Sequence, residues 1–306
     1  MPRRFTNEDP SADRNLRDLF RWATTRAPKR WPRWVENNVE YTPRTPVPGE
    51  LLITFVNHST FLIQAHGTNV LTDPVWSTRV SPVQWMGPAR AHAPGIPFDR
   101  LPPVHVVLVS HNHYDHMDLP TLRGLDAQFA PQFVTTLGNK AYLEARGLRR
   151  VAELGWWDTF EDVTATPAQH FAARTPFDRN RTWWAGFACT LAGKRLFFTG
   201  DSGYAMHFAS IGSRLGPFDV SLVPIGAYEP RWFMSAAHMN PEEAVRAHLD
   251  LGSPLSVAMH FGCFQLTDEA IDEPEQELAA ARQRHGVPAS AFRVLRPGDT
   301  LVVGDV

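Results

Sequence analysis

The sequence predicts an α/β protein in which two β-sheets pack together and helices cover their outer faces. Three observations support this class. Short apolar segments typical of strands recur from Leu51 onward, several segments carry helix start or stop signals, and strands followed by helices occur twice without regular βαβ alternation. With 306 residues, of which 43% are hydrophobic and 20% charged, the chain can bury a sizeable core.

The first half of the folded region is predicted to begin with strands. Val104–Val109 is a continuous apolar run, which indicates a strand buried on both faces. Asp118 can cap a following helix that has Pro120 in its first turn. The other elements predicted here are strands at Leu51–Val56, Thr60–Gln64 and Val70–Thr72, a helix at Asn139–Arg146 closed by Gly147, and a strand at Leu148–Leu154.

The second half has one strong helix signal. Asn240 is followed by Pro241 and, three residues after the cap, by Glu243, so a helix should run from here to about Leu251. The other elements predicted here are a hairpin of Trp183–Leu191 with Arg195–Thr199, strands at Val220–Ile225, Leu255–His260 and Phe292–Leu295, and a charged helix at Pro274–Arg284.

Composition excludes several classes of protein. The 30 Lys and Arg residues nearly balance the 32 Asp and Glu residues, which argues against a nucleic-acid binder with a basic surface. Cys189 and Cys263 are too few for a disulfide framework, and no apolar stretch approaches the ~20 residues of a membrane span. The start of the chain lacks the apolar segment of an export signal, so we expect a cytoplasmic protein. A homodimer is compatible with the sequence, which does not fix the oligomeric state.

Residues 1–48 differ from the rest and are predicted to form an N-terminal extension to a main domain at 49–306. They are rich in tryptophan, proline and arginine and have no alternating strand pattern. One short amphipathic helix is expected from Asp13 to Thr24, with Leu16, Leu19 and Phe20 at helical spacing.

A cluster of histidines directly follows the apolar strand Val104–Val109. The segment reads His111-Asn112-His113-Tyr114-Asp115-His116. Imidazole and carboxylate are ligands of divalent ions such as zinc, and residues two apart in an extended loop can point the same way. The loop therefore predicts a metal site of two ions rather than an ordinary polar turn.

Two ions need more ligands than one loop supplies. His170, Asp201 and His260 are candidates, and Asp201 and His260 come directly after or at the end of predicted strands. A single histidine is more often structural than a ligand, but three candidates downstream of such a loop favour ligation.

These residues, in this order, resemble the metallo-β-lactamase superfamily, whose fold is a four-layer αβ/βα sandwich. Several segments are similar to one branch, the N-acyl-phosphatidylethanolamine-hydrolysing phospholipase D family. The similarity covers about Leu51 to Val302 and includes Leu71-Thr72-Asp73-Pro74-Val75, Met86-Gly87-Pro88, Gly200-Asp201-Ser202-Gly203-Tyr204, Pro224-Ile225-Gly226-Ala227-Tyr228-Glu229-Pro230-Arg231-Trp232-Phe233-Met234, His238-Met239-Asn240-Pro241-Glu242-Glu243-Ala244-Val245 and His260-Phe261-Gly262-Cys263-Phe264.

The resemblance implies roles for individual residues. His111, His113 and His170 would hold one metal, Asp115, His116 and His260 the second, and Asp201 would bridge them. Asp73 would orient a ligating imidazole, or would only cap a turn. His238 would be an active-site group that does not bind metal, or an ordinary loop histidine. Zinc is the expected metal.

The implied reaction is hydrolysis of a phosphodiester by a hydroxide that bridges the metals, with the metal ligands Asp115 and Asp201 and the non-ligand His238 as catalytic residues. The leading substrate is a phospholipid, which would yield a phosphatidic acid and an N-acylethanolamine-like alcohol. Alternatives are hydrolysis of a soluble lactone, a cyclic phosphate or a small phosphodiester, and a metal-binding protein without turnover. Neither Ser59 nor Cys263 is expected to be a nucleophile. Arg174 and Arg231 could contact phosphate or could be structural.

Two hypotheses remain for residues 1–48. Aromatic residues interleaved with basic ones are typical of an interfacial anchor, which would give peripheral contact with a membrane. Alternatively, the aromatic residues pack on the fold as a strap. The residues concerned are Phe20, Trp22, Trp31 and Trp34, with Arg17, Arg21, Arg26, Lys29, Arg30 and Arg33.

Overall fold

The computed structural model describes residues 4–9 and 14–304, whose strands form two mixed sheets. The first sheet has, in spatial order, β14 (Thr300–Val303), β1 (Leu51–Asn57), β2 (Thr60–Ala65), β3 (Thr68–Thr72), β4 (Val106–Val109), β5 (Gln132–Thr136) and β6 (Val151–Leu154). The second has β13 (Phe292–Arg293), β12 (Ser256–Met259), β11 (Val220–Pro224), β10 (Lys194–Phe198), β9 (Gly186–Leu191), β8 (Val163–Thr166) and β7 (Thr159–Phe160).

The two sheets are built in the same way. In the first, β1, β2 and β3 are antiparallel neighbours, and β3 to β6 are then parallel. In the second, β7 to β10 are antiparallel and β10 to β13 are parallel. Each half of the chain therefore supplies several parallel strands whose carboxyl ends meet at one edge.

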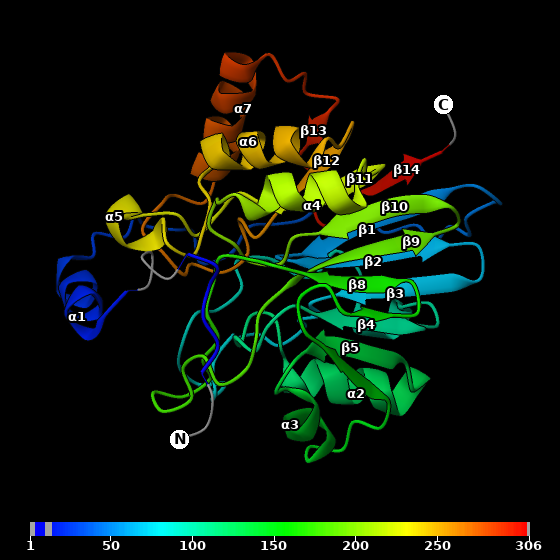
Figure 1. Ribbon diagram of the computed structural model, residues 1–306, viewed down its shortest axis with the longest axis horizontal. Coiled ribbons are helices and arrows are strands. Elements are labelled where there is room, and N and C mark those ends of the chain that lie inside the picture. Colours follow the sequence, from blue (N-terminus) through cyan, green and yellow to red (C-terminus); the bar gives the residue numbers. More distant parts are fainter. Residues whose placement is uncertain (1–3, 10–13, 305–306) are drawn as a thin grey trace.

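Helices cover the outer face of each sheet, which gives four layers (Figure 1). One apolar core lies between the sheets and contains Ile53 and Phe187, and a second, with Val107 and Leu122, lies under the helices of the first sheet. The helices are α2 (Leu119–Phe129) and α3 (Lys140–Glu144) on the first sheet, α4 (His207–Leu215), α6 (Pro241–Leu251) and α7 (Glu273–His285) on the second, and α1 (Leu16–Thr25) and α5 (Arg231–Met234) at one side, with a short 3₁₀ turn at Phe98–Arg100. The predicted sandwich of two sheets with outer helices is confirmed.

Local signals account for several helix boundaries. Asn240 accepts a hydrogen bond from the backbone of Glu243, whose side chain binds back to Asn240, so the predicted capping box at α6 is confirmed. Asp118 stands at the start of α2 but does not cap its backbone; its carboxylate binds Thr121 Oγ1 and the N–H groups of Trp76 and Ser77. The position was correct, but the capping interaction was wrong.

Some predicted bounds were too long, and some elements were not predicted. The helix expected at Asn139–Arg146 is limited to Lys140–Glu144, and the strand expected at Trp183–Leu191 begins at Gly186. The helix expected from Asp13 begins at Leu16; Asp13 lies outside the described residues. The elements not predicted are β5, β7, β8, β14, α4 and α5.

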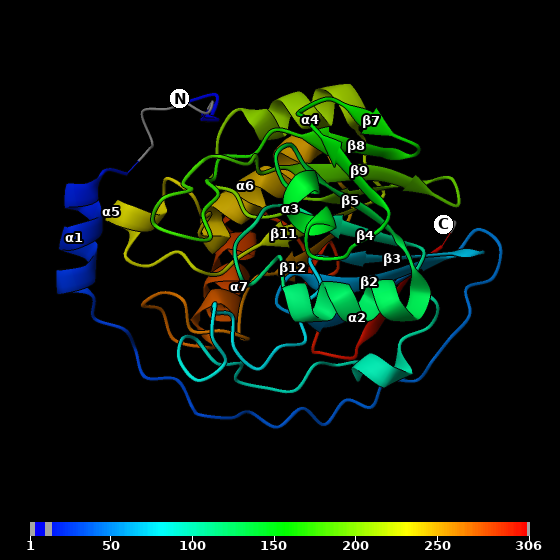
Figure 2. The same ribbon diagram turned by 90° about the horizontal axis from the view of Figure 1, so that it is seen from below.

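The N-terminal segment follows the outside of the molecule before it enters β1 (Figure 2). The Phe5 ring packs on Trp183 at a centroid distance of 4.9 Å, and Trp22 stacks on Phe233 at 5.2 Å. The indole N–H of Trp31 donates to the carbonyl oxygen of Glu269. Parts of this segment therefore pack on the fold as a strap.

Candidate metal centre

The histidine loop begins where β4 ends, and hydrogen bonds fix its first residues. The backbone N–H and the hydroxyl of Ser110 both donate to the carboxylate of Asp73, at 2.7 and 2.5 Å. Arg174 donates through Nη1 to the carbonyl oxygens of Asn112 and Met117, each at 2.8 Å. The turn after β3 and a distant arginine therefore hold both ends of the loop.

One group of imidazoles comprises His111, His113 and His170. His111 Nε2 lies 2.9 Å from His113 Nδ1, and His170 Nε2 lies 3.3 Å from the same atom. His170 Nδ1 bonds to the carbonyl oxygen of Ala237, and His111 Nδ1 bonds to Ser110 Oγ. Because these contacts use Nδ1–H as the donor, Nε2 of both rings is left with a free lone pair directed at the group.

A second group comprises Asp115, His116 and His260. Asp115 Oδ2 lies 3.4 Å from His116 Nε2 and 3.5 Å from His260 Nε2. His116 donates through Nδ1 to Asp73 Oδ2 at 2.6 Å, which leaves its Nε2 facing the group. Asp73 thus makes the contact expected of a residue that orients an imidazole.

Asp201 lies between the two groups. Its Oδ2 atom is 3.1 Å from His116 Nε2, 3.0 Å from His260 Nε2 and 3.8 Å from His170 Nε2. The loop after β10 supplies this carboxylate, and the end of β12 supplies His260. Strands of both sheets therefore bring all seven predicted ligand residues into one buried cluster.

The chemistry of the cluster fits divalent metal ions. Within the described part of the chain, His116 Nε2, His260 Nε2 and Asp201 Oδ1 are buried and have no hydrogen-bond partner. Unsatisfied buried polar atoms are costly in a folded protein, but imidazole and carboxylate atoms that converge in this way are what zinc and similar ions bind. Groups of these residues that could hold a cation have their ligand atoms within 4.8 Å of one another.

Electrostatics point in the same direction. Burial alone would lower the pKa of His116, but Asp201, Asp115 and Asp73 raise it well above its ordinary value. In the same way, burial lowers the pKa of His260, but Asp201 and Asp115 together outweigh it and raise this pKa to about 9. The carboxylates therefore favour positive charge beside His116 and His260, whether it is the charge of a proton or of a metal ion.

His238 lies at the edge of the cluster. Its Nδ1 is 3.9 Å from Asp201 Oδ2, and its ring centroid is 5.0 Å from that of His170. Burial lowers the pKa of His238 to about 3, so the ring is neutral at pH 7. Arg231 donates to the carbonyl oxygen of His238 and pairs with Glu243, which fixes the loop that carries the imidazole.

Three other sequence candidates have structural contacts. The Nη1 donors of Arg174 and Arg231 are directed at backbone carbonyls, which supports the structural alternative for both. Cys263 is fully buried with Val75 and Phe264, as expected for a packed core thiol, and burial raises its pKa to about 12.

Sequence reasoning missed two residues at this site. His58, in the turn between β1 and β2, lies 3.1 Å from Asp115 through its Nε2 atom. Asn7 accepts a hydrogen bond from the N–H of His170 and donates one to its carbonyl oxygen. Strand direction was an available signal for His58, because β1 and β3 run the same way and their ends share an edge. No sequence signal connects Asn7 with His170.

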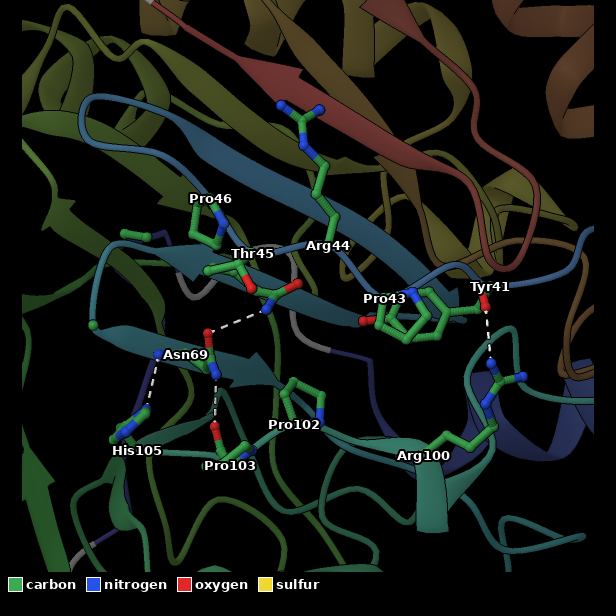
Figure 3. Close-up of a pocket in the computed structure, with 13 residues that line it drawn as sticks. Tyr41, Pro43, Arg44, Thr45, Pro46, Asn69, Arg100, Pro102, Pro103 and His105 are labelled. Carbon is green, nitrogen blue, oxygen red and sulfur yellow. Dashed lines mark hydrogen bonds between the residues drawn. The ribbon is translucent and has the colours of Figure 1, made fainter.

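A separate cavity of about 500 Å³ does not belong to this site (Figure 3). Its lining includes Tyr41, Asn69 and His105, and Asn69 donates hydrogen bonds to His105 Nδ1 and to the carbonyl oxygen of Pro103 in its wall. Asn69 and His105 lie at the starts of β3 and β4, whereas the cluster lies at the ends of these strands.

Comparisons with known proteins agree with this geometry. Residues 68–261 match the model of the Beta-lactamase superfamily domain. The chain is 41% identical to an uncharacterised protein of Mycobacterium tuberculosis, over 95% of this chain and 82% of that protein. It is 37% identical to N-acyl-phosphatidylethanolamine-hydrolyzing phospholipase D 1 of Caenorhabditis elegans, over 74% of this chain and 68% of the relative.

A solved structure shows the same fold. The metallo-hydrolase Igni18 of Ignicoccus hospitalis superposes with a TM-score of 0.62 at 21% identity, covering 83% of this chain and 98% of its own. At this identity the likeness concerns the arrangement of strands and helices alone.

Proposed function

Because the chain belongs to the β-lactamase superfamily and is a metal-dependent hydrolase, we propose that it hydrolyses a phosphodiester of an N-acyl-phosphatidylethanolamine-type phospholipid. Water cleaves the bond between phosphorus and the ethanolamine oxygen. The products are a phosphatidic acid, which keeps the phosphoryl group, and an N-acylethanolamine, whose oxygen takes up a proton.

The observation that carries this proposal is the convergence of seven ligand-type side chains, with Asp201 between two groups. In the proposed assignment, His111, His113 and His170 hold one ion, Asp115, His116 and His260 hold the other, and Asp201 contacts both. Zinc is the metal we assign, because imidazole and carboxylate suit it. When bound, such ions would lower the pKa of a bound water towards ~7 and neutralise charge on the phosphoryl oxygens.

His238 is the proposed acid–base residue. At the edge of the cluster, its imidazole would take a proton from the attacking water and pass it to the departing alkoxide. Arg231 acts through the loop backbone and holds the imidazole in place.

A phospholipid substrate requires contact with a bilayer, and we assign this contact to α1. Leu19 and Phe20 are 47% and 71% exposed, and Arg17 and Arg21 flank them. Apolar side chains bordered by arginines favour the interface of an anionic membrane. Trp22 packs on Phe233, which fastens the helix to the fold. No helix in the described residues is long and apolar enough to span a membrane.

The segment between β8 and β9 lies on the same side of the molecule as α1 (Figures 1 and 2). Phe177 in this segment is also largely exposed. Because the segment begins next to His170, a surface that includes both elements would present a lipid headgroup close to the cluster.

The test is turnover by zinc-loaded protein in water labelled with ¹⁸O. The proposal expects N-acylethanolamine release from vesicles that contain N-acyl-phosphatidylethanolamine, with the label in phosphatidic acid and none in the alcohol. Bis(p-nitrophenyl) phosphate, a cyclic phosphate and a lactone are the comparison substrates. Faster turnover of any of these than of the vesicles would favour the soluble-substrate alternatives. If none of the substrates is turned over, the result would contradict the proposed hydrolysis.

A further inference from the structure

His58 contacts the candidate metal centre from outside the segments that define it. It lies in the turn between β1 and β2, and its side chain is 1% exposed. Its Nε2 atom is 3.1 Å from Asp115 Oδ2, the oxygen that also faces His116 and His260. Three imidazole nitrogens from three elements therefore converge on one carboxylate oxygen.

The backbone at His58 is held in an unusual conformation. Its φ is +48°, in the left-handed region that few residues other than glycine adopt, and His260 opposite has φ +60°. The N–H of His260 donates to the carbonyl oxygen of His58 at 2.8 Å, and their ring centroids are 4.1 Å apart. Such strain persists where the surrounding structure fixes it, and it is concentrated at functional sites.

We propose that His58 is a positioning residue of the second metal site, donating Nε2–H to Asp115 and fixing the oxygen that the metal binds. This inference rests on the dinuclear site proposed above. A carboxylate oxygen has two lone pairs, so Oδ2 can accept this hydrogen bond and still bind a cation. Among the described residues, His58 Nδ1 has no hydrogen-bond partner, so the hydrogen bond to Asp115 is the one this side chain makes there.

Two substitutions separate positioning of Asp115 from a merely structural role. Asparagine tolerates the left-handed backbone better than most residues, but its side chain is too short to reach Asp115. Glutamine is strained there, yet its amide N–H can replace Nε2–H of the imidazole. A structural role therefore predicts that His58→Asn is the milder change, whereas positioning predicts that His58→Gln is milder.

The experiment is metal titration of the full chain after removal of metal with a chelator. Zinc binding is followed against a competing dye, and Co²⁺ binding by its visible absorption. We expect wild-type protein to bind two equivalents. His58→Asn should bind the second equivalent about 10–100-fold more weakly, with the first unchanged, and His58→Gln should recover most of this loss. The cobalt spectrum of His58→Asn should differ only in the second equivalent.

A second arm tests whether His58 acts through Asp115. In an Asp115→Asn background, His58→Asn should cause no further loss of metal affinity, because the pair is coupled. An additive loss, wild-type affinity in His58→Asn, or equal weakness of the Asn and Gln variants would each overturn the inference. Fewer than two equivalents in wild-type protein would instead contradict the proposed dinuclear site, and this inference with it.

Discussion

At the scale of single residues, the cluster depends on hydrogen bonds that select which nitrogen each imidazole presents. Asp73 does this for His116, and the Ala237 carbonyl does it for His170. The pattern of ligand types in the sequence predicted which residues meet, and the family resemblance predicted that Asp73 orients an imidazole. The contact of His170 with the Ala237 carbonyl could not be predicted, because it depends on a backbone atom far away in the chain.

Asp201→Ala should abolish turnover and reduce the metal content. Wild-type protein should carry about two zinc ions per chain, and the variant one or none, because this carboxylate faces both groups. Turnover of the variant should fall by more than the 10–100-fold typical of losing a residue that only hydrogen-bonds to a metal ligand. Elemental analysis and the vesicle assay measure both effects.

The control for Asp201→Ala is His66→Ala, an exposed turn residue. His207, which lies outside the ligand motifs, is not a suitable control, since it is buried and bonds to Ser202, next to Asp201. Active wild-type protein with at most one ion per chain would contradict the two-metal site.

His238→Ala should separate metal binding from catalysis. Metal content should stay at the wild-type value, whereas turnover should fall roughly 10²–10⁴-fold, as for loss of an acid–base group. Elemental analysis together with a pH profile of kcat checks this expectation. Full activity in the variant would reduce His238 to a loop residue.

At the scale of elements, the predictions were good where local signals are strong and poor where tertiary pairing decides. The capping box marked α6, and the apolar run marked β4. The segment that forms β14 is short and follows a turn, and it becomes a strand by pairing with β1 from the other end of the chain. Helix α4 contains Gly212 and five other weak helix formers, and packing rather than propensity stabilises it.

The N-terminal segment combines features of both hypotheses for residues 1–48. Of its basic residues, Arg26 and Lys29 form ion pairs with Asp268 and Glu273. Trp22 and Trp31 contact the fold, whereas Phe20 and Trp34 are exposed. Point substitutions can therefore test the strap and the proposed membrane contact separately, which a truncation cannot.

Replacing Leu19 and Phe20 with Ser should weaken vesicle binding without affecting the fold. Both side chains are largely exposed, so little packing is lost. We expect at least a 10-fold loss of affinity for anionic vesicles in a sedimentation assay, since burying each side chain in the interface is worth about 1.5–3 kcal/mol. Turnover of bis(p-nitrophenyl) phosphate should not change. Vesicle affinity equal to wild type would contradict docking through α1.

Asn7→Ala should destabilise the protein and weaken zinc binding. The Asn7 side chain makes two hydrogen bonds to the His170 backbone and accepts one from the Trp184 indole. Loss of this partner leaves the backbone groups of His170 unsatisfied at a cost of about 1–3 kcal/mol, whereas the Trp184 indole keeps its bond to the Ala168 carbonyl. Urea unfolding and zinc titration measure the effects. Thr6→Ala, an exposed neighbour, is the control, and identical behaviour of the two variants would exclude a strap that supports His170.

At the scale of the whole molecule, buried neutral histidines make stability depend on pH. Burial lowers the pKa of His207 from 6.5 to about 3. The unfolded chain therefore binds a proton below pH 6.5 that the folded protein rejects. The free energy of unfolding therefore has its full value above pH 6.5. It decreases as the pH falls towards 3, by up to about 1.4 kcal/mol per pH unit.

His207→Gln should reduce the change of unfolding free energy with pH by the contribution of about one proton. Urea unfolding of metal-free wild type and variant between pH 7 and pH 5 measures the difference, and the other buried histidines contribute equally to both proteins. The variant should be less stable at pH 7, yet lose less stability on acidification. Parallel pH dependences would show that His207 is not the group responsible.

The hydrogen bonds of Asn7 also fix an order of events during synthesis. Asn7 lies 163 residues before His170 in the chain. At translation rates of about 5–20 residues per second, the ribosome needs roughly 10–30 s to make the partner that Asn7 requires. Asn7 therefore stays without this partner, after it is made, until residue 170 has also been made. An N-terminal fusion or a tethered nascent chain would delay maturation of the enzyme at this step.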